Sequence, residues 1–250
     1  MALGLTAAHR RRLREVWRSA GWPCKDLIEL DLLAAGHLHS QWDEQGRETL
    51  RVTDAGLQLL ALARQRHQAA RNAHEDLVVR VAADMQRAGR LVWRGLTLRA
   101  PLVDEQGSTQ WVMAMPDVFS IRQTTVEGYV EPVVHEIKVS RADLLSDLRK
   151  PAKGQAYRAM ASQCWYVVRA GLAGLDDVPA DFGLMEAGDA GLTVLRPAPR
   201  KPMTLSLPVW MALARAHAEP ALDTDAQGWL SAPHDLELME SGPASSSTQP

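Results

Sequence analysis

Two carboxylates and a lysine in residues 116–138 have the types and the spacing for metal-assisted phosphate chemistry. Asp117 follows Pro116 at the start of one strand-like stretch, and Glu136 and Lys138 lie two positions apart in the next. Residues two apart in a strand project from the same face. Two facing carboxylates repel each other unless a hard cation neutralises them, and oxygen ligands suit Mg²⁺ or Mn²⁺. An ammonium group beside them can stabilise the charge that develops on a phosphate.

A β-hairpin is the element that would bring these side chains together. The stretch 118–123 is typical of a strand, 129–139 is again rich in valine, and turn residues lie between them. With the turn centred at 126–127, antiparallel pairing puts Asp117 directly opposite Glu136 on one face of the sheet. The competing interpretation is an aspartate that caps a turn, followed by an ordinary exposed strand with charged side chains.

The arrangement resembles the PD-(D/E)xK nuclease superfamily, with Pro116-Asp117 and Glu136-Ile137-Lys138 as the two motifs. The wider stretch HEIKVSRADLLSDLRKPAKGQAYRAMASQCWYVV is similar to a bacterial group within it, the MmcB-like DNA-repair-related proteins. This resemblance implies a restriction-endonuclease-like mixed sheet flanked by helices, where a metal-bound water attacks a DNA phosphodiester. It implies that Asp117, Glu136 and the main-chain carbonyl of Ile137 bind the metal and that Lys138 is the catalytic lysine.

Three further residues match the superfamily less closely. Glu75 begins a predicted helix over 74–88, where related nucleases often place an acid that reaches the metal or its water. It could equally be an ordinary acid in the first turn of a helix, where the macrodipole favours negative charge. Lys153 and Tyr157 are four residues apart and share one helical face, so a cation and a phenol could contact the scissile phosphate together. The alternative for this pair is a solvated, salt-bridged helix start.

The net charge of −2 argues against a DNA partner only until its distribution is considered. Residues 218–250 hold six acidic residues and no lysine or arginine, which leaves 28 basic against 24 acidic residues in 1–217. Within 138–169, seven basic residues accompany two acidic ones. We expect salt-dependent phosphate contacts in this segment. The residues expected to make them are Arg141, Arg149, Lys150 and Lys153.

The first seventy residues predict a separate module. Capping and turn signals indicate helices over 6–20 and 24–35, strands over 37–42 and 48–52, and a helix over 57–67. This order is similar to the winged-helix domains of bacterial regulators. If the module binds DNA, the predicted phosphate contacts are Arg10, Arg11, Arg12, Arg47 and Arg51. Otherwise it is a protein-docking or dimerising domain whose arginines are merely solvated.

The chain therefore predicts three parts: a winged-helix domain in 1–70, a nuclease-like α/β domain in 71–217 and an acidic, partly disordered tail in 218–250. Strands on both sides of helices indicate a mixed sheet rather than an all-β barrel. The expected helices of the second part are 74–88, 154–162 and 208–218, and its expected strands beside the hairpin are 91–101, 111–115, 164–168, 183–186 and 192–195.

The composition excludes several classes of protein. With 46% hydrophobic and 23% charged residues, the chain is typical of a globular protein and not of a disordered or fibrous one. Cys24 and Cys164 are too few for a disulfide framework, and we expect two buried thiols in a reducing cytoplasm. No apolar run approaches a membrane span. The eight tryptophans are expected mostly in cores or interfaces, without the interleaving with basic residues that is typical of single-strand binding.

These patterns predict a cytoplasmic, metal-dependent DNA nuclease that hydrolyses duplex or branched DNA in repair or in defence against foreign DNA. A homodimer is expected if it cuts both strands, as many related nucleases do. The alternative is a non-catalytic DNA-binding or regulatory protein, in which the winged helix acts and the nuclease-like domain is a scaffold. Cleavage of RNA would use the same residues, so the sequence does not separate these substrates.

Overall fold

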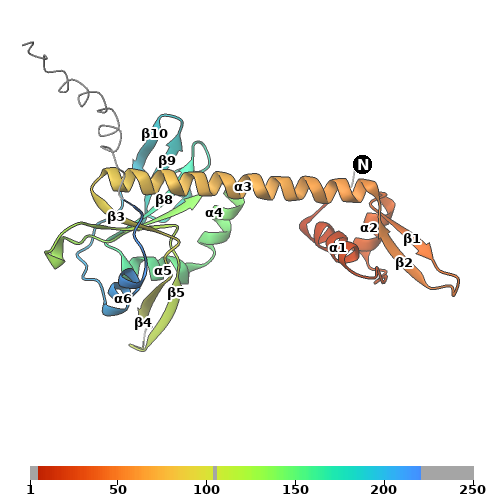
Figure 1. The fold of residues 1–250 in the computed structure, drawn as a ribbon, viewed down its shortest axis with the longest axis horizontal. Helices are drawn as coiled ribbons and strands as arrows, with labels where there is room; N and C mark the ends of the chain where they lie inside the picture. Colours follow the sequence, from red (N-terminus) through yellow and green to blue (C-terminus); the bar gives the residue numbers. More distant parts are fainter. Residues whose placement is uncertain (1–4, 104–105, 221–250) are drawn as a thin grey trace, which may run out of the picture. The chain divides into compact units, whose positions relative to one another are not determined.

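The computed structural model describes residues 5–103 and 106–220. The chain divides into two compact units, 1–76 and 77–250 (Figure 1). Helix α3 (Asp54–Arg87) contributes residues to both. The predicted helices over 57–67 and 74–88 are parts of this one helix, and the boundary predicted near residue 70 falls inside it.

The first unit has the predicted order of elements. Thr6 caps the first helix, with its side chain accepting from the His9 amide. The second helix begins three residues later than expected because the Asp26 side chain caps it, accepting from the Glu29 amide at 2.8 Å. The elements before α3 are α1 (Ala7–Arg18), α2 (Leu27–Ala34) and the antiparallel strands β1 (Leu38–Trp42) and β2 (Glu48–Val52). Its buried core is formed by Leu13, Val16, Leu32, Leu38 and Leu50.

The second unit is built on a mixed six-stranded sheet with the strand order β10-β9-β8-β7-β6-β3. The neighbours β7, β8 and β9 run parallel, and the other pairs are antiparallel. Helices flank this sheet, so the predicted α/β class with a mixed sheet is confirmed. The strands are β3 (Arg90–Arg94), β6 (Val118–Arg122), β7 (Val133–Lys138), β8 (Gln163–Arg169), β9 (Gly183–Gly188) and β10 (Gly191–Arg196).

A second, two-stranded sheet comes from β4 (Leu98–Val103) and β5 (Thr109–Ala114). The single strand predicted over 91–101 is therefore wrong. Gly95 interrupts it with a φ of +57°, a conformation that favours glycine, and the Gly95 amide donates to the Asp117 carbonyl at 3.1 Å. The remaining elements are α4 (Arg141–Leu148), which was not predicted, α5 (Pro151–Met160), α6 (Leu207–Arg215) and the 3₁₀ turns η1 (Glu127–Tyr129) and η2 (Leu175–Asp177).

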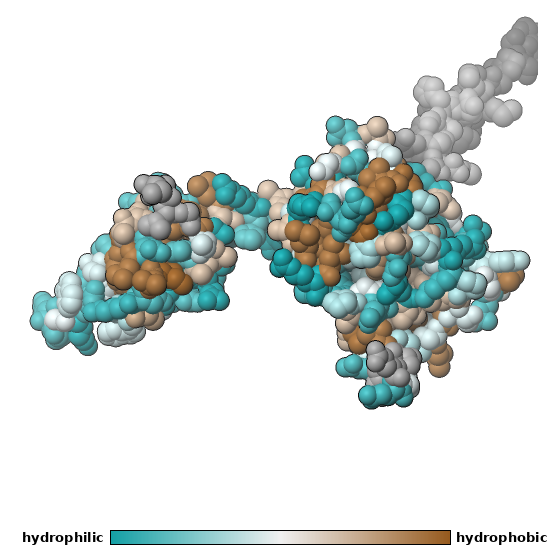
Figure 2. Space-filling view, turned by 180° about the vertical axis from the view of Figure 1, so that it is seen from behind, coloured by the Kyte–Doolittle hydropathy of each residue, from teal (hydrophilic) through white to brown (hydrophobic). Residues whose placement is uncertain are grey.

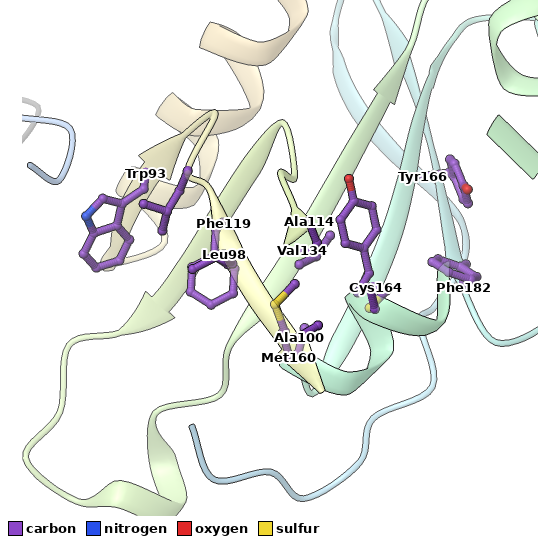
Figure 3. Packing of buried hydrophobic residues seen from close by; sticks show 14 of the residues in the cluster. Trp93, Leu98, Ala100, Ala114, Phe119, Val134, Met160, Cys164, Tyr166 and Phe182 are labelled. Atoms are coloured by element: carbon purple, nitrogen blue, oxygen red, sulfur yellow. The ribbon is translucent and has the colours of Figure 1, made fainter. Parts of the chain in front are cut away.

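The two faces of the large sheet bury different sets of side chains, as the two-residue period of strands requires. On one face, Val118 and Ile137 pack with Val81 of α3. On the other face, neighbouring residues such as Phe119 join a larger core that includes α5, α6 and the β4–β5 hairpin (Figure 3). The predicted placement of Ile137 in an apolar core is confirmed, because it is fully buried.

Several predictions about single side chains need correction. Cys24 is exposed, whereas Cys164 is buried as expected. Among the described tryptophans, Trp93 and Trp165 are buried. Four others are exposed and do not belong to a core: Trp17, Trp22, Trp42 and Trp111. The surface in Figure 2 is mixed, with hydrophobic patches among hydrophilic residues on both units. No described helix is both long and apolar enough to cross a membrane. Most of the predicted acidic tail, 221–250, lies outside the described residues.

Candidate functional site

The pairing of β6 with β7 has the predicted register. Val118 lies opposite His135, and one further step along both chains sets Asp117 opposite Glu136. The Asp117 carboxylate also accepts a hydrogen bond of 2.7 Å from the amide of Ile137, which ties it to the carboxyl end of β7. The structure therefore brings the two predicted metal-binding carboxylates to the same place on the sheet.

Glu136 is the centre of a buried polar cluster. It is 2% exposed, and its Oε1 accepts from Lys138 Nζ at 2.6 Å and from Lys153 Nζ at 2.5 Å. Its Oε2 accepts from the hydroxyl of Tyr157 at 2.7 Å. Lys153 and Tyr157 share the sheet-facing side of α5, as their spacing predicts. We call this set the Glu136 cluster, with the members Asp117, Glu136, Lys138, Asp147, Lys153 and Tyr157.

Asp147 is the member that the sequence analysis missed. It is 8% exposed on α4, accepts from Lys153 Nζ at 2.7 Å and lies 3.8 Å from Lys138 Nζ. Its other oxygen accepts from the Tyr166 hydroxyl at 3.1 Å. Leu144 lies three residues earlier on α4 and is fully buried, so Asp147 is on the buried side of a helix that was not predicted.

Burial controls the proton affinities in the cluster. It raises the pKa of Glu136, and the neighbouring Asp117 raises it further. Burial opposes the charge of Lys153, but Glu136 and Asp147 hold the pKa of Lys153 above its usual value. Burial and the nearby Glu136 carboxylate raise the pKa of Tyr157, so the phenol keeps its proton and donates it in a hydrogen bond.

The donor set suits a hard cation. The cluster contains three carboxylates against two ammonium groups, an excess of one acid. Mg²⁺ typically binds through one or two carboxylates and keeps several waters, so Asp117, Glu136 and the carbonyl of Ile137 would suffice. For this, Glu136 Oε1 must release at least one lysine. Within the described ranges, no three His, Cys, Asp or Glu residues are placed to hold a metal ion by themselves, so a third ligand would come from the main chain or from water.

The other residues predicted around this site have different placements. Glu75 is exposed on α3 in the first unit, and its role stays a prediction. Arg149 and Lys150 are exposed between α4 and α5, where a phosphate could reach them. Arg141 instead makes a two-armed ion pair with Asp177, with distances of 2.7 and 3.0 Å. This pair fixes a loop to α4, and the predicted phosphate contact of Arg141, whose side chain is 54% exposed, stays a prediction.

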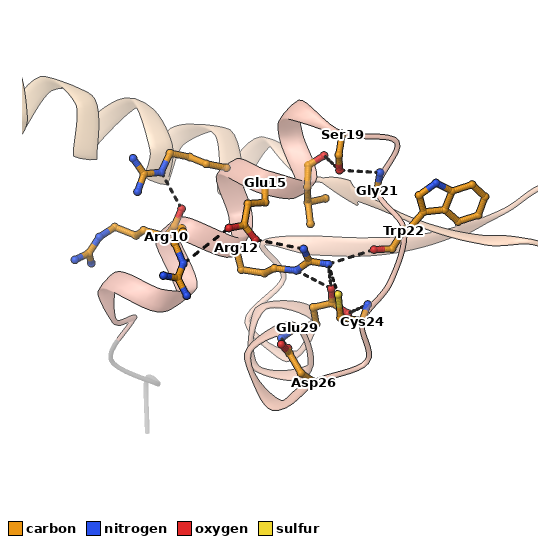
Figure 4. Close-up of polar contacts among 12 residues, drawn as sticks. Arg10, Arg12, Glu15, Ser19, Gly21, Trp22, Cys24, Asp26 and Glu29 are labelled. Carbon is orange, nitrogen blue, oxygen red and sulfur yellow. Dashed lines mark hydrogen bonds and ion pairs between the residues drawn. The ribbon is translucent and has the colours of Figure 1, made fainter.

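Arg12 in the first unit also has a structural role in place of the predicted phosphate contact (Figure 4). Its Nε donates to Glu29 Oε1 at 2.8 Å, and its Nη2 also contacts Glu29. The same Nη2 donates to the carbonyl of Trp22 at 3.2 Å and lies 3.1 Å from Cys24 Sγ. Glu29 is 1% exposed, so this arginine neutralises a buried carboxylate and joins α1 to α2.

The remaining predicted arginines of this unit are mostly exposed. Arg47 pairs with Asp43 in the turn of the β1–β2 hairpin, at 2.7 Å. Arg51 approaches the side chain of Gln41 at 3.4 Å. Arg11 is 73% exposed on α1. Their predicted contacts with DNA are not tested by these placements.

No family model and no curated protein matches this chain. Among solved structures, it is similar to a protein of unknown function from Silicibacter pomeroyi. The two are 22% identical, and the match covers 63% of this chain and 89% of the other with a TM-score of 0.38. A likeness this weak carries no argument about function.

Proposed function

We propose that this protein is a metal-dependent DNA nuclease of the PD-(D/E)xK type, with a restriction-endonuclease-like second unit and a winged-helix first unit. The observation that carries the proposal is the β6–β7 register, because it sets Asp117 opposite Glu136. Lys138 and Lys153 then converge on the same carboxylate. Carboxylates and ammonium groups at one point of a sheet are the groups that phosphodiester hydrolysis requires.

Asp117, Glu136 and the carbonyl of Ile137 would hold the ion. A bound Mg²⁺ or Mn²⁺ supplies Lewis acidity, which polarises the phosphate and lowers the pKa of a water molecule. Lys138, beside Glu136, would stabilise negative charge on the phosphate. Tyr157 remains a hydrogen-bond donor, since its raised pKa keeps the phenol protonated.

The surroundings of the cluster support an anionic substrate. Arg149 and Lys150 are exposed on the turn between the two helices that contribute Asp147 and Lys153. Exposed cations beside a site attract phosphates and add a salt-dependent contribution to affinity. A role in DNA repair or in defence against foreign DNA, and a homodimer that cuts both strands, belong to the same proposal.

The proposal is tested by cleavage assays with linear duplex, single-stranded, supercoiled and branched DNA in Mg²⁺, Mn²⁺ or a chelator. Asp117→Asn keeps the shape of the side chain and removes its charge, and we expect at least a 100-fold loss of metal-dependent cleavage. Asp176→Asn is the matched control, because Asp176 is exposed and outside the cluster. Equal cleavage by wild type and Asp117→Asn, with both folded by circular dichroism, would refute this mechanism.

One observation favours a second candidate function, a non-catalytic DNA-binding or regulatory protein. Both oxygens of Glu136 already accept hydrogen bonds from protein donors, and the residue is almost fully buried. Such a satisfied network can serve purely as a scaffold. Titration calorimetry with Mn²⁺ separates the two candidates, since a nuclease site binds the ion with a loss of affinity in Asp117→Asn. DNA binding without Mn²⁺ binding and without cleavage would favour the scaffold.

A further inference from the structure

The first unit contains a basic groove between α1 and the first half of α3. Its volume is about 900 Å³, and every residue that lines it belongs to the first unit. None of the described lining residues is acidic. Five arginines, one tryptophan and one histidine provide its polar and aromatic groups: Arg10, Arg14, Trp17, Arg18, Arg64, His67 and Arg71. We call this feature the α1–α3 groove.

The arginines form two rows. Arg10, Arg14 and Arg18 follow each other at steps of four residues on α1, so they share one side of the helix. Arg64 and Arg71 are seven residues apart on α3, which is about two turns and again one side. At a rise of 1.5 Å per residue, each row is roughly 11–12 Å long. Two facing rows of this length match the charge of a short stretch of phosphate backbone.

The bottom of the groove is apolar and carries an exposed aromatic ring. Leu57 and Leu60 of α3 line it, and Trp17 lies between the arginines of α1. Trp17 is 60% exposed, because the adjacent Leu13 and Val16 fill the core instead. An accessible ring bordered by guanidinium groups is the combination on which unpaired bases stack while their phosphates are neutralised.

We propose that the α1–α3 groove binds single-stranded DNA. The arginine rows are roughly 11–12 Å long, which is enough for the backbone of only a few nucleotides. The stacking surface selects a single strand over a duplex, since the faces of paired bases are covered by their neighbours. This binding needs no metal and lies in the first unit, so it goes beyond the proposed nuclease site and does not rest on it.

The usual binding mode of a helix-turn-helix protein fits this unit poorly. That mode would place the second helix, α2, in the major groove of a duplex. Yet Asp26 caps α2, Asp31 lies within it, and its Leu27 is 78% exposed. Acidic and apolar groups on that helix repel or fail to contact a phosphate backbone. The basic surface of the unit lies along α1 and α3 instead.

The test measures fluorescence anisotropy of a labelled oligothymidylate with the full-length protein in a chelator. We expect the double variant Arg14→Ala/Arg64→Ala to bind about tenfold more weakly than wild type. Its salt dependence should be shallower by about 1.4, because each neutralised phosphate of a single strand contributes about 0.7. The matched control is Arg66→Ala/Arg87→Ala, which removes the same charge from exposed positions of α3 that do not line the groove and should change the affinity less than twofold.

A second pair of variants tests the stacking surface. Trp17→Leu should weaken binding at least fivefold, the lower limit for the loss of one base–aromatic contact. Trp42→Leu is the control, because Trp42 has nearly the same exposure, 62% against 60%, on the β1–β2 hairpin. Circular dichroism establishes that each variant is folded.

Three outcomes would overturn the proposal. One is a duplex of the same length that binds as tightly as the single strand, which would indicate ordinary duplex recognition. Another is competition by polyglutamate at equal charge concentration, which would indicate a groove for acidic peptides. The third is a loss of affinity in the control variants that equals the loss in the groove variants. The binding assay contains a chelator, so it does not depend on metal-dependent cleavage, and failure of the nuclease proposal is distinguishable from failure of this one.

Discussion

Replacing Arg12 by methionine tests the structural role of the ion pair that joins α1 and α2. Methionine keeps an apolar stem of similar length but leaves the Glu29 carboxylate with only two backbone donors, the amides of Cys24 and Lys25 at 2.8 and 2.6 Å. Removal of one partner from a buried pair typically costs about 3–5 kcal/mol, because the other charge is left buried. We therefore expect the first unit to lose stability, since the Arg12 side chain is itself only 17% exposed.

The free-energy cost of protonating Glu29 sets an upper limit to the loss of stability in Arg12→Met, because the carboxyl can take up a proton instead of staying charged and unpaired. The carboxyl has a usual pKa of 4.5. Taking up a proton at pH 7 then costs about 3.4 kcal/mol, at about 1.4 kcal/mol for each pH unit. The same step costs only about 0.7 kcal/mol at pH 5. The expected loss in Arg12→Met is thus about 3 kcal/mol at pH 7 and no more than about 0.7 kcal/mol at pH 5.

The wild-type protein should behave differently over this range. Burial raises the pKa of Glu29, but the Cys24 amide and the Arg12 guanidinium outweigh it and hold the pKa below its usual value. A lowered pKa means that the stabilisation is present above pH 4.5 and is lost as the pH falls through the lower folded value. The contribution of the Arg12–Glu29 pair to the stability of the wild-type protein is therefore constant between pH 5 and 7. The difference in stability between wild type and Arg12→Met becomes smaller at lower pH, because the variant gains stability there.

Hydrogen exchange of the full-length protein, read on peptides from residues 5–60, measures the first unit separately from the second. A loss of 3 kcal/mol corresponds to exchange about 100-fold faster at pH 7, after correction for the intrinsic rate. Arg11→Met is the control, since Arg11 is on the same helix and 73% exposed. Equal protection of Arg12→Met and Arg11→Met, or a gap that stays constant from pH 7 to 5, would refute the reasoning.

Two further predictions concern cysteine reactivity and packing. At pH 8, a thiol-reactive disulfide reagent should modify one cysteine of the folded protein, the exposed Cys24, because burial raises the pKa of Cys164 to about 12; rapid modification of both would contradict this. Gly183→Ala should destabilise the second unit by about 1–3 kcal/mol through overpacking. A Cβ there would lie 2.3 Å from the ring of Trp165, whereas Gly188→Ala, with nothing within 4 Å, is the thermal-denaturation control.

The hairpin that carries the candidate site could be predicted from the sequence because its information is local. The valines on both sides of the turn and the two-residue period were enough to pair Asp117 with Glu136. The interruption at Gly95 was missed, since an isolated glycine in a strand-like run indicates a break only when its φ is known. A strand that bends away into a second sheet depends on packing that a linear pattern does not contain.

The charged residues show where the sequence is insufficient. The sequence shows three basic residues but not their partners. In the structure, Arg12 pairs with Glu29 and Arg141 pairs with Asp177, both outside the candidate site. Lys153 pairs with Glu136 within it. Their partners are 17, 36 and 17 residues away in the chain, so only the tertiary fold selects them. The α1–α3 groove was missed for the same reason, because its aromatic ring and its arginines come from two helices separated by the hairpin.

Side chains of β6 and β7 alternate between the two faces of the sheet, so this region has positions that tolerate an insertion and positions that do not. A residue added within β7 (Val133–Lys138) would turn Glu136 toward the apolar layer beneath α3 and Ile137 toward the lysines, because side chains alternate between faces. Residues 125–128 are exposed and pair with neither strand. A fluorophore tag or a short peptide placed there leaves the alternation of side chains in β6 and β7 unchanged. The connection between β6 and β7 is therefore the natural place to attach a reporter without disturbing the site.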